Sequence, residues 1–293
     1  MIRVRVTLDD LKEAAACRSG IVAFEAAYPD GLDVEWTVDE QKRIVAGPCK
    51  KYIGWAVGRM LLPAIIMKKA ALDGVDLSEA DLCGSRFEGA TLKGANLIRA
   101  KLQRADFVGA DMDRANLTGA SLVRATLCRA KLAYANLSDA DLLGADLGGA
   151  YLNGANLGNA RLRGTNLVDA NLEGAHLAGA NLYWSRLDGA NLAGANLEGA
   201  ILWRANAEGV DLSRAELSGA SLVEARLLHA KLRGANLAGA RLMCADLREA
   251  NLEGANLAGA NLRRANLLGC ILKDTNLEGA DIEDANLEEA RRC

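Results

Sequence analysis

Residues 190–199 read ANLAGANLEG, and this five-residue pattern runs through most of the chain. A leucine or another apolar residue recurs at every fifth position from Leu72 to Leu287, in 44 consecutive units. Leu fills 39 of these positions, and Ala stands two residues earlier in 37 units. A period of five matches neither an α-helix nor a flat strand. The repeat therefore predicts a solenoid, in which stacked units share one continuous core.

A second period sets the number of sides of this solenoid. Asn precedes the leucine position in 8 of 11 units of the class that runs from Asp76 to Asn276 in steps of 20, but in only 9 of the other 33. Four units therefore make one coil, and we expect the stacked Asn side chains to form a ladder of amide hydrogen bonds. Gly follows the leucine position by two in 23 units, as the positive φ of a type II turn requires. The predicted fold is an all-β, four-sided parallel β-helix of about 11 coils.

Residues 1–69 lack the repeat and contain all three prolines, so we expect a small, mainly helical capping domain there, followed by the β-helix over 70–293. A capping box at Thr7–Asp10 predicts a helix that extends to about Ala27. We expect residues 33–37 to form a short strand, Thr37 to begin a second helix, and residues 51–67 to form a third helix. The apolar run 53–67 is too short to span a bilayer, so no membrane association is expected.

The composition offers little chemistry. The seven cysteines form no C-x-x-C pair, and the two histidines lie on different sides more than two coils apart. Neither histidine has a partner at metal-ligand spacing, and no nucleophile–base pair is found. We therefore expect no metal, no cofactor and no enzymatic activity. No signal peptide is recognised at the start of the sequence, and the reduced cysteines favour a cytoplasmic location.

One side of the predicted solenoid differs from the other three. Outward charges sum to about +3 on the side that contains Leu82, against −5 on each neighbouring side and 0 on the opposite one. Exposed aromatic residues and arginines gather there, as they do in protein–protein interfaces. The candidate interaction residues are Val123, Leu143, Arg161, Arg163, Tyr183, Trp184, Ile201, Trp203, Arg204, Val223, Arg241, Met243, Arg263 and Arg264. Three explanations remain open, namely binding of another protein, docking of the chain's own N-terminal domain, and chance variation on a tolerant surface.

Units such as ANLEG (195–199), ADLLG (140–144) and ANLRR (260–264) resemble the A(D/N)LXX signature of pentapeptide repeat proteins. The resemblance covers about three quarters of the chain and implies a right-handed quadrilateral β-helix. Residues 16–20, ACRSG, resemble a small module that precedes such repeats in some bacterial and phage proteins.

The resemblance adds a second functional hypothesis. Some family members mimic DNA, bind type II topoisomerases such as gyrase and protect them from quinolones or toxins. This chain departs from them in its basic side and its uninterrupted repeats. A non-catalytic, protein-binding scaffold is therefore the first hypothesis, and the DNA mimic is the alternative. We expect no direct nucleic-acid binding, and either a monomer or a homodimer of rods packed side by side.

Overall fold

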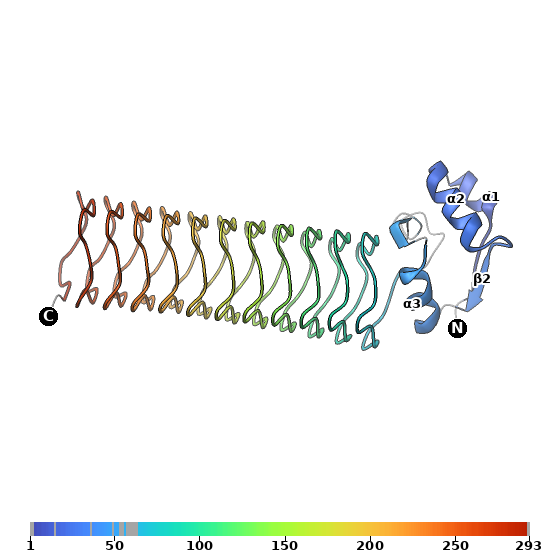
Figure 1. Ribbon diagram of the computed structural model, residues 1–293, viewed down its shortest axis with the longest axis horizontal. Helices are drawn as coiled ribbons and strands as arrows, with labels where there is room; N and C mark the ends of the chain where they lie inside the picture. The colour runs from blue at the N-terminus through green and yellow to red at the C-terminus, as the bar shows by residue number, and fades with distance from the viewer. Residues whose placement is uncertain are drawn as a thin grey trace.

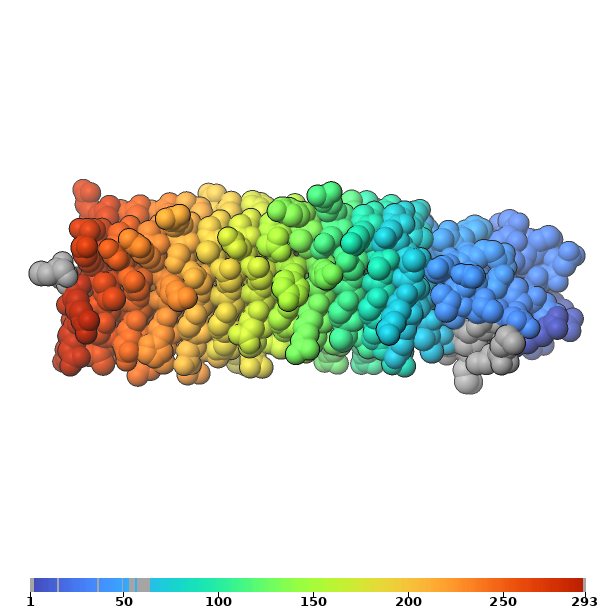
Figure 2. All heavy atoms as spheres, turned by 90° about the horizontal axis from the view of Figure 1, so that it is seen from below, coloured from blue at the N-terminus to red at the C-terminus, as the bar shows by residue number. Residues whose placement is uncertain are grey.

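The protein is a rod, with a small unit of helices and strands at one end and a long solenoid behind it (Figure 1). This computed structural model describes residues 3–14, 16–35, 37–48, 50–52, 56 and 64–291. The two views at right angles agree that the N-terminal unit continues the line of the rod (Figure 2). It does not fold back along the coils.

The solenoid is built from parallel bridges between residues 20 apart in the sequence. The first pairs Ile66 with Arg86, and the pattern continues at every fifth residue as far as Ile271 and Arg291. A tight turn closes each unit, as where the amide of Val75 donates to the carbonyl of Leu72 at 3.2 Å. The bridges confirm the 20-residue coil inferred from the Asn pattern.

The regular coil starts earlier than expected. Ile65 and Met67 are buried at the small-residue and leucine positions of a unit, and Ile66 between them forms the first bridge. The predicted helix over 51–67 is therefore wrong at its C-terminal end, because these three residues already match the inward and outward pattern of the repeat. Residues 50–52 form a 3-10 turn, whereas 53–55 and 57–63 lie outside the described residues.

The core is a narrow aliphatic column with one aromatic pair. The leucine positions and the small residues two before them are almost completely buried as far as Leu272, except for the half-buried Val75 in the first coil. Each buried leucine contributes roughly 1.5–3 kcal/mol relative to an exposed one. Phe87 and Phe107, 20 residues apart, stack with ring centroids 4.9 Å apart and planes 4° apart. Ala207 is buried at a leucine position, and Val210 is buried at a position that is usually Ala.

Every corner has positive φ, whether or not the residue is Gly. Gly154 has φ +64°, as predicted, but Arg124 has φ +56° at the equivalent position. Side chains of non-Gly corners often extend over the next corner, so the stem of Arg124 lies near Gly144 and the ring of Tyr134 covers Gly154. Gly is therefore frequent at corners both for its φ and because it leaves room for the preceding side chain.

The Asn ladder is only partly as expected. Amide bonds join Asn256 to Asn236 at 3.0 Å and Asn276 to Asn256 at 3.1 Å. Among the described residues, no such bond joins Asn116, Asn136 and Asn156. Their side-chain oxygens instead accept the amide two residues later, as from Ser138 to Asn136 and from Gly158 to Asn156. The preference for Asn or Asp before the leucine is thus explained mainly by this local turn.

The N-terminal unit begins with a two-stranded antiparallel sheet, in which β1 (Arg3–Val6) pairs with β2 (Leu32–Glu35). The helices are α1 (Leu8–Glu13), α2 (Arg18–Ala27) and α3 (Val38–Ala46). The capping box at Thr7 and the helix start at Thr37 are confirmed. The single helix predicted to Ala27 is wrong, because α1 ends at Glu13 and an extended Cys17 begins α2. Strand β1 was not predicted at all.

This unit supplies hydrogen-bond acceptors that a preceding coil would otherwise supply. Within the solenoid each outward residue donates its amide to the carbonyl 21 residues earlier, as Arg86 does to Ile65 at 2.9 Å. At the first coil, the amide of Asp81 donates to the carbonyl of Lys50 at 2.9 Å. The amide of Ile66 donates to the side-chain oxygen of the buried Gln41 at 2.6 Å. The N-terminal unit therefore satisfies backbone donors at the end of the rod.

Candidate functional site

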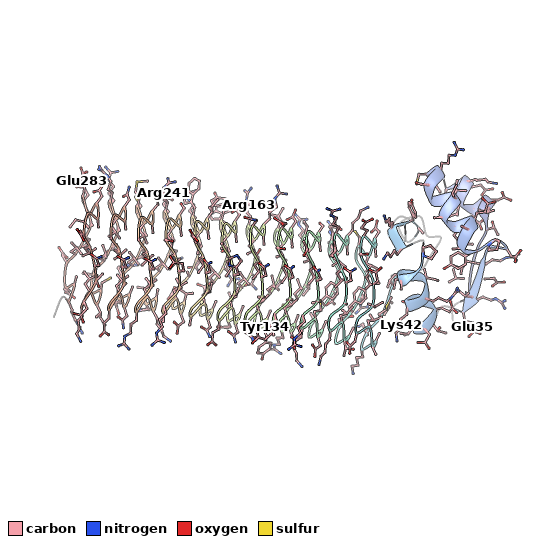
Figure 3. All side chains as sticks on the ribbon, in the orientation of Figure 1. Glu35, Lys42, Tyr134, Arg163, Arg241 and Glu283 are labelled. Carbon is pink, nitrogen blue, oxygen red and sulfur yellow. The ribbon has the colours of Figure 1, made fainter. Side chains whose placement is uncertain are left out.

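The side with the unusual charge is a continuous strip along the solenoid, which we call the Leu82 side. It comprises Leu82 and its equivalents at 20-residue steps, with the outward residue before and the two residues after each one. Arg163, Arg241 and Glu283 lie along one edge of the rod, and Tyr134 lies along the opposite edge (Figure 3). The predicted side is therefore a single surface, because stacked coils place its residues in straight columns.

Most predicted residues are exposed on this side. The exposed ones are Leu143, Arg161, Arg163, Trp184, Ile201, Trp203, Arg204, Arg241, Met243 and Arg264. Val123, Tyr183 and Arg263 are half-buried. Val223 is buried, with only 8% of its surface exposed, so its inclusion as an exposed residue was wrong. It stands in the same column as the larger Trp203 and Met243, one coil away on either side, and such neighbours cover a small side chain.

Three aromatic rings form a packed cluster at the middle of the strip. Tyr183 and Trp184 stack with centroids 5.5 Å apart and planes 7° apart, and Trp203 packs against Tyr183 at 5.3 Å and 51°. Trp184 nevertheless keeps 57% of its surface exposed, and Trp203 keeps 41%. These rings are held in place before any partner arrives, which lowers the entropy lost on binding.

Two arginines extend this cluster along the rod. The guanidinium carbon of Arg163 lies 5.2 Å from the ring centroid of Tyr183, and that of Arg204 lies 5.4 Å from Trp203. Arg204 also donates to Glu224 at 2.7 Å. This hydrogen bond raises the pKa of Arg204 and lowers the pKa of Glu224 below its ordinary value. The rings, Arg204 and Glu224 thus form one connected network.

The remaining arginines fall into two groups. Arg161 lies 3.8 Å from Asp141, Arg264 lies 3.6 Å from Asp284, and Arg263 pairs with Asp281 and Glu283. Across the part of the chain that the structure describes, four arginines on this side have no carboxylate within ion-pair distance. They are Arg104, Arg124, Arg163 and Arg241.

Sequence reasoning missed a smaller aromatic feature on the opposite side. Tyr134 is 63% exposed and Tyr151 is 52% exposed, both more than Trp203. Exposed aromatic residues therefore do not gather on the Leu82 side alone. The signal was present in the sequence, since both tyrosines occupy outward positions of the repeat.

Cysteine thiols and clusters of metal-ligating side chains are the groups that could support catalysis. Burial raises the pKa of the Cys83 and Cys128 thiols to about 11 and that of Cys270 to about 12, so these thiols stay protonated near neutral pH. Within the described ranges, no three His, Cys, Asp or Glu side chains gather as metal ligands would. No helix in the same residues is long and apolar enough to cross a membrane.

The described residues of the chain's own N-terminal unit do not cover the Leu82 side. Its described residues contact the first coil, through Lys50 to Asp76 at 2.8 Å and through Gln41 to Ile66. The unit then extends away from the rod along its axis (Figure 1). The self-docking explanation therefore does not hold for the residues that the structure describes, and the aromatic cluster is open to a partner.

A family model described as pentapeptide repeats matches the chain in eight overlapping copies between residues 67 and 291. Among solved structures, the chain is similar to HetL, a pentapeptide repeat protein involved in heterocyst differentiation regulation from the cyanobacterium Nostoc. The identity is 33%, over 76% of this chain and 87% of HetL, with a TM-score of 0.42.

Two further solved structures show lower similarity. QnrB1, a plasmid-mediated fluoroquinolone resistance protein, is 22% identical over 61% of this chain and 87% of its own, with a TM-score of 0.34. A thylakoid-lumen pentapeptide repeat protein from Arabidopsis thaliana is 28% identical over 47% and 68%, with a TM-score of 0.14. No curated protein matches the chain significantly.

Proposed function

We propose that this chain, which belongs to the pentapeptide repeat family, is a non-catalytic scaffold that binds another protein through its Leu82 side. The observation that carries the proposal is the cluster of Tyr183, Trp184 and Trp203, which is packed and yet largely exposed. Trp, Tyr and Arg are the residues that dominate binding energy at protein interfaces. A preorganised cluster of all three therefore provides an anchor for a partner.

The solenoid supports a scaffold better than an enzyme. Its inward positions are filled by Leu and Ala, so the interior has no room for a substrate. Three of the thiols, those of Cys83, Cys128 and Cys270, have raised pKa values, which lowers their reactivity. Hydrogen bonds to Ser19 and to the backbone of Gly20 lower the pKa of the exposed Cys17, but this thiol lies in the N-terminal unit and has no general base described beside it. What the rod offers instead is a long surface with regularly spaced side chains, as other solenoids use for binding.

A second candidate is the DNA-mimicking topoisomerase binder. The sides next to the Leu82 side favour it, because each has a net outward charge of −5. The charge also changes along the rod, however. Residues 90–129 have a net charge of +4 and residues 270–289 a net charge of −6. A duplex has uniformly negative charge along its length, so this alternation favours the scaffold. A gyrase supercoiling assay with purified protein, with and without quinolone, separates the two: the scaffold predicts no change.

The same proposal includes several finer features. The rod is a right-handed quadrilateral β-helix of about 11 coils, and it works in a bacterial cytoplasm as a monomer or as two rods packed side by side. Residues 1–69 form its capping domain. Sedimentation analysis of the purified chain distinguishes the two assembly states.

The experiment that tests the function compares three tagged proteins expressed in the source cells. They are the wild type, a Trp184→Ala/Trp203→Ala variant, and a Tyr134→Ala/Tyr151→Ala variant on the opposite side. The scaffold predicts proteins that co-purify with the wild type and the tyrosine variant but are lost from the tryptophan variant. If the tryptophan variant retains the same proteins at the same yield, the proposed surface is wrong.

A further inference from the structure

The cations of the Leu82 side are unevenly neutralised along the rod. Between residues 101 and 163 this side carries five basic residues, which are Lys101, Arg104, Arg124, Arg161 and Arg163, against one acidic residue, Asp141. Lys101 pairs with Asp81 and Arg161 with Asp141, so the other three have no carboxylate within ion-pair distance among the described residues. Towards the C-terminal end, by contrast, Arg263 and Arg264 are paired with carboxylates of the last coil. The free positive charge therefore lies beside the aromatic cluster and not at the end of the rod.

Exposed apolar side chains lie among these cations. Leu143 is 43% exposed, Trp184 57%, Ile201 40%, Trp203 41% and Met243 38%. They lie on successive or nearby coils of the same side, so they form a strip of apolar side chains with polar residues between them. Such a strip on a folded protein marks a surface that a partner covers.

The positions of the unpaired arginines give this strip a pattern. Arg124 precedes Trp184 by three coils, and Arg241 belongs to the coil three steps after it. With about 4.8 Å between coils, each arginine lies roughly 14 Å from the indole along the rod. Arg163 lies one coil before Trp184. An apolar centre is thus flanked on both sides by guanidinium groups that have no carboxylate of their own.

From this arrangement, and resting on the proposed protein-binding function, we infer that the Leu82 side binds an acidic segment of a partner protein. A large apolar side chain of that segment packs on Trp184 and Trp203, and carboxylates on either side of it pair with Arg124, Arg163 and Arg241. Arg pairs with carboxylates in bidentate geometry, which fixes register as well as adding affinity. The adjacent sides, each of net charge −5, repel an acidic segment and so restrict it to this strip.

The same features disfavour a nucleic acid as the occupant. Single strands bind where successive bases stack on a series of aromatic faces along a groove. The ring of Tyr183 is already in contact with Arg163, Trp184 and Trp203, so its faces are not available to a base. Phosphates that continued beyond the strip would also meet the acidic neighbouring sides. An acidic peptide needs only the exposed faces of the two indoles and the unpaired arginines.

The test is a selection from a library of random 12-residue peptides, made in parallel on three full-length proteins. These are the wild type, Arg163→Gln/Arg241→Gln and Trp184→Ala/Trp203→Ala. We expect peptides enriched on the wild type to contain an aromatic or large aliphatic residue flanked by Asp or Glu. Their Kd should rise at least about tenfold on the arginine variant, increase with salt, and be unmeasurable on the tryptophan variant. Circular dichroism verifies that both variants keep the β-structure.

Other outcomes separate this inference from the function on which it rests. Neutral or basic peptides that still require Trp184 and Trp203 would overturn the acidic partner but leave the binding surface intact. Peptides that bind all three proteins equally, or no enrichment on the wild type, would overturn both. A fluorescent 12-nucleotide oligo-dT that binds the wild type and loses affinity with Arg163→Gln/Arg241→Gln would replace the acidic peptide by a nucleic acid.

Discussion

The indole of Trp184 stacks on the ring of its sequence neighbour Tyr183, with centroids 5.5 Å apart and planes 7° apart. Successive residues seldom stack, because side chains in extended backbone point to opposite faces. Here Trp184 occupies a corner with φ +59°, where the chain turns and both side chains point outward. A bulky residue thus occupies a left-handed backbone position where Gly is frequent in this repeat, and this backbone strain destabilises the corner locally.

Trp184→Gly tests whether the strained tryptophan at this corner serves partner binding and not the stability of the fold. Gly removes the strain of positive φ, about 1 kcal/mol, while the lost aromatic stacking costs about 0.5–1.5 kcal/mol. We therefore expect a melting temperature within a few degrees of the wild type, together with loss of partner binding. Thermal denaturation and the peptide-binding assay measure the two effects separately. A large drop in melting temperature would show that Trp184 serves mainly the fold.

Core packing predicts a different response at two leucine positions. Leu157→Ala opens a cavity in a fully buried column and should cost about 2–5 kcal/mol. Ala207→Leu restores the side chain that neighbouring coils have, and should be neutral or stabilising unless Val210 already occupies the space. Urea denaturation provides both free energies of unfolding. A greater loss for Ala207→Leu than for Leu157→Ala contradicts this packing.

Two buried hydroxyls at equivalent inward positions should respond with opposite signs. The hydroxyl of Thr165 donates to the carbonyl of Leu142 at 3.0 Å, whereas that of Ser185 has no hydrogen-bond partner among the described residues. Ser185→Ala removes an unsatisfied buried group and should stabilise the protein by about 1 kcal/mol. Thr165→Ala should destabilise it by about 1–2 kcal/mol. Equal destabilisation by both would show that Ser185 has a partner after all.

The cap of the solenoid should depend on a single side-chain oxygen. Gln41 is 4% exposed and accepts the amide of Ile66 at 2.6 Å, in place of a carbonyl from a preceding coil. Gln41→Leu keeps the volume but removes the acceptor, so we expect faster hydrogen exchange at Ile66. The loss of stability should be about 1–2 kcal/mol. Unchanged exchange at Ile66 would indicate that Gln41 acts by packing alone.

The junction between the cap and the first coil should weaken in acid. Lys50 and Ser78 hydrogen-bond to Asp76 and lower its pKa from 3.8 to about 2. Because the folded-state pKa lies below the unfolded one, the stabilisation is present above about pH 4 and is lost as the pH falls through about 2. The difference in melting temperature between the wild type and Asp76→Asn should therefore be constant near neutral pH and disappear near pH 2. A difference that persists at pH 2 would assign the effect to another group.

The solenoid was predictable because its signal repeats. Each five-residue unit repeats the same bridge to the unit 20 residues away. The period of 5 therefore identifies the inward positions, and the period of 20 gives the length of one coil. The role of Asn was less visible, because the same residue type serves both an amide ladder and a local turn. The side-chain oxygen of Asn156, for example, accepts a hydrogen bond from the amide of Gly158 in its own turn, and not from an Asn side chain in an adjacent coil.

The N-terminal unit was harder to predict because its elements are short and occur once. The break between α1 and α2 falls within AAACRSG, which has no Pro or Gly before Cys17 to mark it. Strand β1 is stabilised by pairing with β2, about 30 residues away in the sequence, and no local sequence pattern reveals such a partner. On the Leu82 side the residue types were evident from the repeat, but the burial of Val223 depends on the sizes of its neighbours.

Site-specific photo-crosslinking in the source cells tests the central claim most directly. A photoreactive phenylalanine analogue replaces Trp203 in one protein and the more exposed aromatic Tyr134, on the opposite side, in another. The account predicts a discrete crosslinked product from position 203 that is abolished when Arg163→Gln and Trp184→Ala are added, and none from position 134. The same product from both positions, or from position 134 alone, would contradict the assignment of the Leu82 side as the binding surface.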